Sequence, residues 1–116
     1  MTVSLRGTRE VQAICQIFRL TGLLDAFSEP TFRKVLSDHI EDSPYNVILD
    51  LSKIDFLDSS GLGALVQLAK QAKTKKGSLH IVTNSRVTQT VKLVRLENFL
   101  PLHNTLDGAI AAVESA

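Results

Sequence analysis

The stretch that decides the fold runs from Val47 to Ala69 and reads VILDLSKIDFLDSSGLGALVQLA. Its first part, Val47–Leu51, is mostly apolar and predicts a strand that is buried on both faces. A short connector through Asp55 and Leu57 is expected next, followed by the tetrapeptide Asp58-Ser59-Ser60-Gly61. Apolar residues then recur at helical spacing. Two hydroxyl groups are therefore predicted where a strand gives way to a helix.

The start of that helix favours negative charge. Unpaired backbone N–H groups and the positive end of the helix dipole stabilise anions there, including a phosphoryl group on a serine. Ser59 and Ser60 are therefore the first candidates for a functional site. Asp58 and the serines also suit plain N-capping, which is worth about 1 kcal/mol over alanine but needs only one such residue. Gly61 and Gly63 each cost a helix roughly 0.8–1 kcal/mol, which indicates a further requirement, such as close passage of a neighbouring element.

Upstream of this stretch, the pattern is β-like as far as Thr21-Gly22, which we expect to end that region. Ser28 can cap the next helix, which the apolar spacing predicts over 29–41. Asp42-Ser43-Pro44 is expected to end this helix. The residues predicted on its inner face are Phe32, Val35, Leu36 and Ile40.

Downstream, the second helix is predicted over about 60–75, with Gly77 as its C-terminal stop. A third helix is predicted over about 85–96, with an inner stripe that includes Val94. The remaining expected elements are a strand over 79–83, a short strand over 100–103 and a closing helix that begins at 105–107. Alternation of strands and helices in one chain of 116 residues predicts a single α/β domain.

The composition excludes several classes of protein. Thirteen basic and twelve acidic residues leave a net charge of +1, without the basic excess of a dedicated nucleic-acid binder. The single cysteine, Cys15, cannot form an internal disulfide, which suits a reducing cytoplasm. No run approaches the ~20 apolar residues that span a bilayer, and the first twelve residues lack a signal-peptide core. A soluble cytoplasmic protein is expected.

Enzyme and metal chemistry find little support in the motifs. Asp58-Ser59-Ser60-Gly61 does not match the Gly-x-Ser-x-Gly elbow of a serine hydrolase. Gly61-Leu62-Gly63 lacks the Gly-Lys-Ser/Thr of a phosphate-binding loop. His39, His80 and His103 are scattered and show no ligand spacing with the cysteine. We therefore expect a protein that is not an enzyme and needs no metal or cofactor.

The motif resembles a known family. Residues 56–65, FLDSSGLGAL, preceded by the strand 47–51, are similar to the STAS domain of bacterial anti-sigma factor antagonists. Residues 20–25, LTGLLD, resemble the family's Gly-Glu-Leu-Asp turn, with Leu23 where the family often has glutamate. The resemblance covers about residues 10–113 and implies one STAS domain over 1–116. It also implies a mixed sheet of about four to five strands, with about four helices packed mainly on one face.

The resemblance further implies a partner-switching protein that regulates transcription indirectly. In that family a serine after the aspartate is phosphorylated by an ATP-binding serine kinase that is also the anti-sigma factor. The unphosphorylated antagonist binds this kinase, and a phosphoserine phosphatase resets the cycle. The family's acceptor falls on Ser59, with Ser60 as second choice, and the chain alone is expected to be a monomer that binds no nucleic acid. The implied partner-binding positions are Asp25, Asp58, Ser60, Gly61, Leu62 and Gly63.

One alternative remains open at this point. A STAS-type module can also serve as a scaffold in a regulatory complex or as a subunit of a transport system, with a partner unrelated to sigma factors. The choice between Ser59 and Ser60 is open as well, because either hydroxyl can lie at the helix start.

Overall fold

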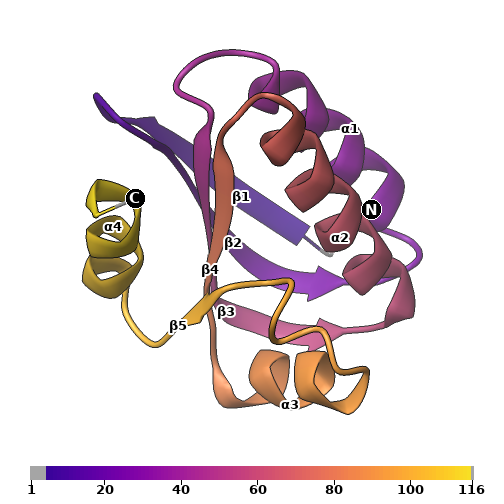
Figure 1. Cartoon of the computed structure of the whole chain (residues 1–116). Coiled ribbons are helices and arrows are strands. Elements are labelled where there is room, and N and C mark those ends of the chain that lie inside the picture. Colours follow the sequence, from indigo (N-terminus) through magenta and orange to yellow (C-terminus); the bar gives the residue numbers. More distant parts are fainter. Residues whose placement is uncertain (1–4, 116) are drawn as a thin grey trace.

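The computed structural model describes residues 5–115 of the chain. Within them, five strands form one sheet and four helices pack around it, which confirms the predicted α/β class (Figure 1). The elements are, in chain order, β1 (Leu5–Val11), β2 (Gln16–Leu24), α1 (Glu29–Ile40), β3 (Asn46–Leu57), α2 (Ser59–Thr74), β4 (Ser78–Val82), α3 (Ser85–Leu93), β5 (Leu102–His103) and α4 (Leu106–Glu114).

The sheet is mixed, as predicted. Its strand order is β1-β2-β3-β4-β5; β1 pairs antiparallel with β2, and every later neighbouring pair is parallel. The carboxyl ends of β2, β3 and β4 therefore meet at one edge of the sheet. This edge is where parallel α/β sheets present their loops, and it contains the junction between β3 and α2.

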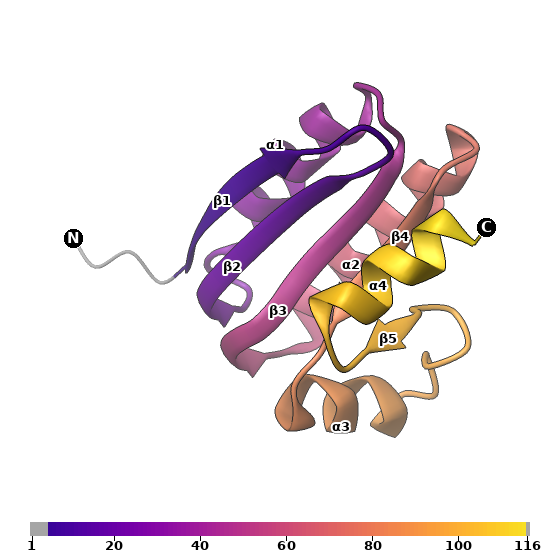
Figure 2. The ribbon, with the colours of Figure 1, turned by 90° about the vertical axis from the view of Figure 1, so that its left-hand side faces the viewer.

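The core has two unequal parts on the two faces of the sheet. The larger cluster contains buried residues of α1, α2 and α3, and the smaller one contains Ala109 and Val113 of α4. In β3 the side chains alternate between the two, since Val47, Leu49 and Leu51 join the larger cluster and Ile48 joins the smaller. Figure 2 shows α4 alone in front of the sheet, with α1 and α2 behind it. The helices thus lie mainly on one face, as predicted.

Two predicted strand ends were wrong. β2 continues past Thr21-Gly22 to Leu24, and β3 continues past Leu51 to Leu57. The two strands extend together, because Leu24 pairs with Leu57 after irregularities in the register that Gly22, with φ of 119°, helps to absorb. The expected connector before Asp58 is therefore strand, which carries β3 directly to the start of α2.

Three side chains also differ from their predicted roles. Val35 is 45% exposed on α1. Val94 is 51% exposed and lies outside α3, which ends at Leu93 and not at the predicted residue 96. Ser28 precedes α1 but makes no side-chain cap; its hydroxyl donates to the Leu23 carbonyl at 2.8 Å instead. Val35 and Val94 thus face solvent rather than the core, and Ser28 forms a hydrogen bond in the loop before α1 instead of capping the helix.

The end of α2 corrects the role given to Gly77. The residue with left-handed backbone is Lys76, with φ of 61°, rather than the glycine. Gly77 is required for a different reason: a Cβ there would lie 1.9 Å from the carbonyl oxygen of Tyr45. The amide of Gly77 still closes the helix by donating to the Ala72 carbonyl at 2.8 Å.

Two histidines on neighbouring strands form a close pair. His80 Nδ1 on β4 lies 3.0 Å from His103 Nε2 on β5, with ring centroids 5.1 Å apart. Burial, and then the proximity of His103, lower the pKa of His80 from its usual 6.5. The folded protein therefore disfavours protonation of the His80 ring.

Because the pKa of His80 is lowered, we expect the protein to become less stable as the pH falls. Below its usual pKa the unfolded chain binds a proton that folded His80 resists, so the free energy of unfolding should begin to fall near about pH 6.5. Urea unfolding between about pH 7.5 and pH 5.5 measures the effect, and His80→Gln should flatten the dependence in that window. An equally steep dependence in His80→Gln would contradict the assignment.

Candidate functional site at the start of helix α2

Asp58 ties together the two loops of the site. It is the N-cap of α2, and its Oδ1 accepts a hydrogen bond from the Gly61 amide at 3.0 Å. Its other carboxylate oxygen accepts from the Ala26 amide, in the loop between β2 and α1, at 3.1 Å. Its own backbone N–H donates to the Leu24 carbonyl at 3.3 Å. One carboxylate therefore caps α2 and holds the neighbouring loop against it.

Asp25 organises that neighbouring loop from within. Its Oδ1 accepts hydrogen bonds from the backbone amides of Phe27 and Ser28, both at 3.0 Å, which forms an Asx-type turn. Ser28 returns the contact, since its hydroxyl accepts from the Asp25 amide at 3.1 Å. The structure thus brings Asp25 and Asp58 into one region through the short loop, with each carboxylate occupied by backbone amides.

The two serines differ in exposure. Ser59 is the first residue of α2 and is exposed, whereas Ser60 is half-buried. Within residues 5–115, neither hydroxyl makes a side-chain hydrogen bond, because Asp58 performs the capping. Ser59 therefore presents a hydroxyl to solvent beside the unpaired amides of a helix N-terminus. Of the two serines, Ser59 is therefore the more accessible from solvent.

The two glycines of the motif have different surroundings. A Cβ at Gly61 would lie 2.6 Å from the Leu24 carbonyl oxygen and 2.7 Å from Leu57 Cδ1, so α2 crosses the ends of β2 and β3 at close range. At Gly63, by contrast, a Cβ would meet nothing within 4 Å, and the residue is exposed. Leu62 between them is buried in the core. The expected close passage therefore holds for Gly61 and not for Gly63.

The sequence did not predict that three apolar side chains at this edge of the sheet would be exposed. Phe27, in the loop that Asp58 holds, is 80% exposed, and Leu23 and Phe56 are 37% and 45% exposed. Leu23 and Phe56 pair across β2 and β3 one position before the strands end. The only available signal was an aromatic residue in a loop between two polar turns, which does not by itself predict exposure. Two of these side chains thus lie near the ends of β2 and β3, and Phe27 lies in the loop that Asp58 holds.

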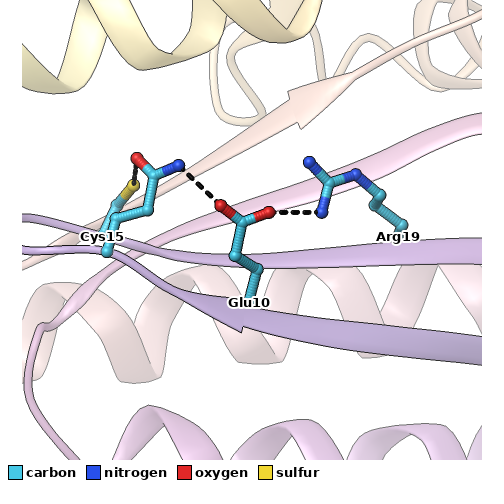
Figure 3. A network of polar contacts seen from close by, with 4 residues as sticks. Glu10, Cys15 and Arg19 are labelled. Atoms are coloured by element: carbon cyan, nitrogen blue, oxygen red, sulfur yellow. Dashed lines mark hydrogen bonds and ion pairs between the residues drawn. The ribbon is translucent and has the colours of Figure 1, made fainter.

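The remaining polar groups do not extend the site. Glu10 bridges Arg19 at 2.7 Å and Gln12 at 2.8 Å, and Gln12 Oε1 lies 3.9 Å from the Cys15 sulfur (Figure 3). Burial, and then the charge of Glu10, raise the pKa of the buried Cys15 thiol, which makes it a poor nucleophile. Across the described part of the chain, no three His, Cys, Asp or Glu residues gather as a metal site. None of the helices in residues 5–115 could span a membrane.

Comparisons with known proteins identify the family. The model of the STAS domain matches residues 6–109, so this chain belongs to the STAS domain family. It is 24% identical over 98 residues to a protein described as a putative anti-sigma factor antagonist, BtrV of Bordetella bronchiseptica, covering 84% of each chain.

Solved structures share the fold. An anti-sigma factor antagonist from Mycobacterium paratuberculosis superposes with a TM-score of 0.87 and 26% identity, over 96% of this chain and 95% of that one. Unphosphorylated SpoIIAA, another anti-sigma factor antagonist, superposes with a TM-score of 0.80 and 20% identity, over 96% and 98% of the two chains. Both of these solved structures are anti-sigma factor antagonists by description, and BtrV is a putative one.

The two glycines predict opposite effects of one substitution in one helix. Gly61→Ala should destabilise the protein, since its new methyl group would meet the Leu24 backbone. Gly63→Ala should stabilise it by about 1 kcal/mol, the difference in helix propensity. Urea unfolding of both variants beside the wild type measures the free energies. Equal shifts for the two would contradict the close approach at Gly61.

The double role of Asp58 predicts a larger loss than capping alone. Asp58→Ala should cost more than the about 1 kcal/mol of an ordinary N-cap, because the loop contact to Ala26 is lost as well. Thr105→Ala is the matched control, since Thr105 caps α4 through one bond, to Gly108, at 3.0 Å. Equal free energies of unfolding for the two variants would show that the loop contact contributes nothing.

Proposed function

We propose that this chain is an anti-sigma factor antagonist controlled by phosphorylation of Ser59. Unmodified, it binds an anti-sigma factor that is also an ATP-binding serine kinase; phosphorylated, it is released, and a phosphoserine phosphatase restores binding. The observation that carries this proposal is the exposed hydroxyl of Ser59 at the first position of α2, left free because Asp58 caps the helix. The descriptions of the relatives as anti-sigma factor antagonists support the same partner class.

A phosphate at Ser59 is compatible with the fold. It adds about −1.5 to −2 charges at neutral pH, and a helix N-terminus tolerates negative charge through its dipole and free amides. The carboxylate of Asp58 is adjacent, but both its oxygens already accept backbone hydrogen bonds. The phosphoserine therefore extends into solvent without breaking a contact of the core. The switch acts on the surface and leaves the domain intact.

The same charge is costly in an interface. Phe27, in the loop that Asp58 holds, and Leu23 and Phe56, near the ends of β2 and β3, offer exposed apolar area that a partner at this edge of the sheet would cover. A dianion placed there loses its hydration, and the negative charge of Asp58 beside it adds repulsion. A loss of only about 3–4 kcal/mol weakens binding more than a hundredfold. Phosphorylation is thus expected to release the partner.

The role proposed is binding rather than catalysis, in the cytoplasm, without a cofactor. Any effect on transcription passes through the partner and does not involve contact of this chain with DNA. A STAS-type scaffold or transport-system subunit is the alternative. It would use the same surface for a partner that is indifferent to the phosphorylation state of Ser59.

Substitutions at Ser59 test the switch. Ser59→Asp should reduce capture of an ATP-binding kinase-type partner from native cells, while Ser59→Ala should bind constitutively and stay folded. The matched control is Ser85→Asp, because Ser85 is also the exposed first residue of a helix, after the N-cap Asn84 of α3. Partner yield and phosphopeptide mass spectrometry of the wild type are the measurements.

The outcomes separate the two functions. Phosphate on Ser59, with a kinase-type partner on the unmodified form alone, would support the antagonist. Equal capture by Ser59→Asp, Ser59→Ala and wild type would remove the switch. A different partner that ignores these substitutions would instead support the scaffold.

A further inference from the structure

A groove runs between β1 and α1, and one end of its lining includes Phe27 and Ser28 of the loop beside the Ser59 site. Its volume is about 520 Å³, within the range of pockets that bind small molecules. The floor consists of side chains from the larger core cluster, Phe18, Leu20, Phe32 and Leu36, and the half-exposed Val35 forms part of the wall. These apolar side chains do not fill the groove, which leaves space for an apolar ligand.

The backbone of β1 contributes to this opening. Gly7 lies opposite Leu20 in the antiparallel pair, and a Cβ there would come within 2.5 Å of Leu20 Cδ2. The strand therefore adds no side chain over the middle of the floor. Because Gly7 has no side chain, the edge strand β1 leaves this part of the core uncovered, and the groove forms there.

The charges that line the groove have one sign. Its lining includes the guanidinium groups of Arg6 and Arg9 but neither aspartate nor glutamate. Arg9 makes no ion pair with any acidic residue among residues 5–115. The groove is apolar and has guanidinium groups at its margin. It is therefore complementary to a ligand with an apolar body and a negative head group.

The position of Arg9 is built into the fold. Its Nε donates to Gln16 Oε1 at 2.9 Å, and the Gln16 side chain is fully buried. The amide nitrogen of Gln16 is fixed in turn by three carbonyl oxygens, those of His39, Asp42 and Pro44, at 2.9–3.0 Å. Since Nε is held in this way, the terminal nitrogens of Arg9 remain to donate to an anion. A buried network thus fixes a cation at the margin of an apolar groove.

We propose that this groove binds a small amphiphilic anion, an unbranched aliphatic carboxylate of the fatty-acid class. The tail lies over Phe18, Leu20 and Leu36, and the carboxylate accepts hydrogen bonds from the terminal nitrogens of Arg9. The proposal goes beyond partner switching and does not depend on Ser59. Binding is a property of the isolated chain, so its failure would leave the proposed function untouched.

Titration calorimetry of the purified chain with dodecanoate, below the concentration at which it forms micelles, tests the site. We expect saturable binding of one molecule, with backbone NMR shifts confined to β1, β2 and α1. Arg9→Gln should weaken binding at least tenfold, and the uncharged dodecanol should also bind at least tenfold more weakly. Absence of saturable binding, or equal binding of dodecylamine, would overturn the proposal.

Two further variants exclude indirect effects. Lys34→Gln removes a positive charge from α1 outside this groove and should leave dodecanoate affinity unchanged. Val35→Asp places a negative charge on the groove wall at a position that is 45% exposed, so the fold should tolerate it while binding falls. Wild-type affinity in both Arg9→Gln and Val35→Asp, with folding verified by circular dichroism, would show that the ligand binds elsewhere.

Discussion

The geometry of the candidate site depends on the carboxylate of Asp58. One oxygen holds the first turn of α2 through the Gly61 amide, and the other holds the β2–α1 loop through the Ala26 amide. Two segments that are about thirty residues apart in the chain thus share one fixed point. This arrangement leaves the neighbouring hydroxyl of Ser59 free of any capping duty. A site that must accept a charged group without losing its shape benefits from this separation of tasks.

In the proposed switch, a phosphate on Ser59 would have two different consequences. Within the isolated chain, the helix dipole and free amides offset it, and no buried contact is disturbed. In an interface with a partner, the same charge would lose its hydration and would lie beside the carboxylate of Asp58. In the proposed switch, phosphorylation would therefore change the affinity for a partner far more than the free energy of unfolding, as a reversible switch requires.

Much of the fold could be predicted from the sequence because its signals were local. The capped helix α2 and the apolar strand β3 both follow from the periodicity of Val47–Ala69. The errors came from long-range effects. Pairing between Leu24 and Leu57 extends two strands beyond their apolar patterns, and the carbonyl of Tyr45, rather than backbone conformation, explains Gly77. Asp58 was predicted only as one of three possible caps of α2. Its second bond, to Ala26, and the exposure of Phe27 depend on tertiary placement that no local pattern contains.

The most direct test of the account is to phosphorylate Ser59 enzymatically or by synthesis and to measure the free energy of unfolding and partner affinity on the same sample. The account predicts a free energy of unfolding within about 1 kcal/mol of the unmodified protein, since the helix terminus accommodates the charge. It also predicts that affinity for the anti-sigma factor falls more than a hundredfold, equivalent to about 3 kcal/mol or more. Loss of folding in step with loss of binding would contradict it, as would a phosphorylated protein that binds unchanged.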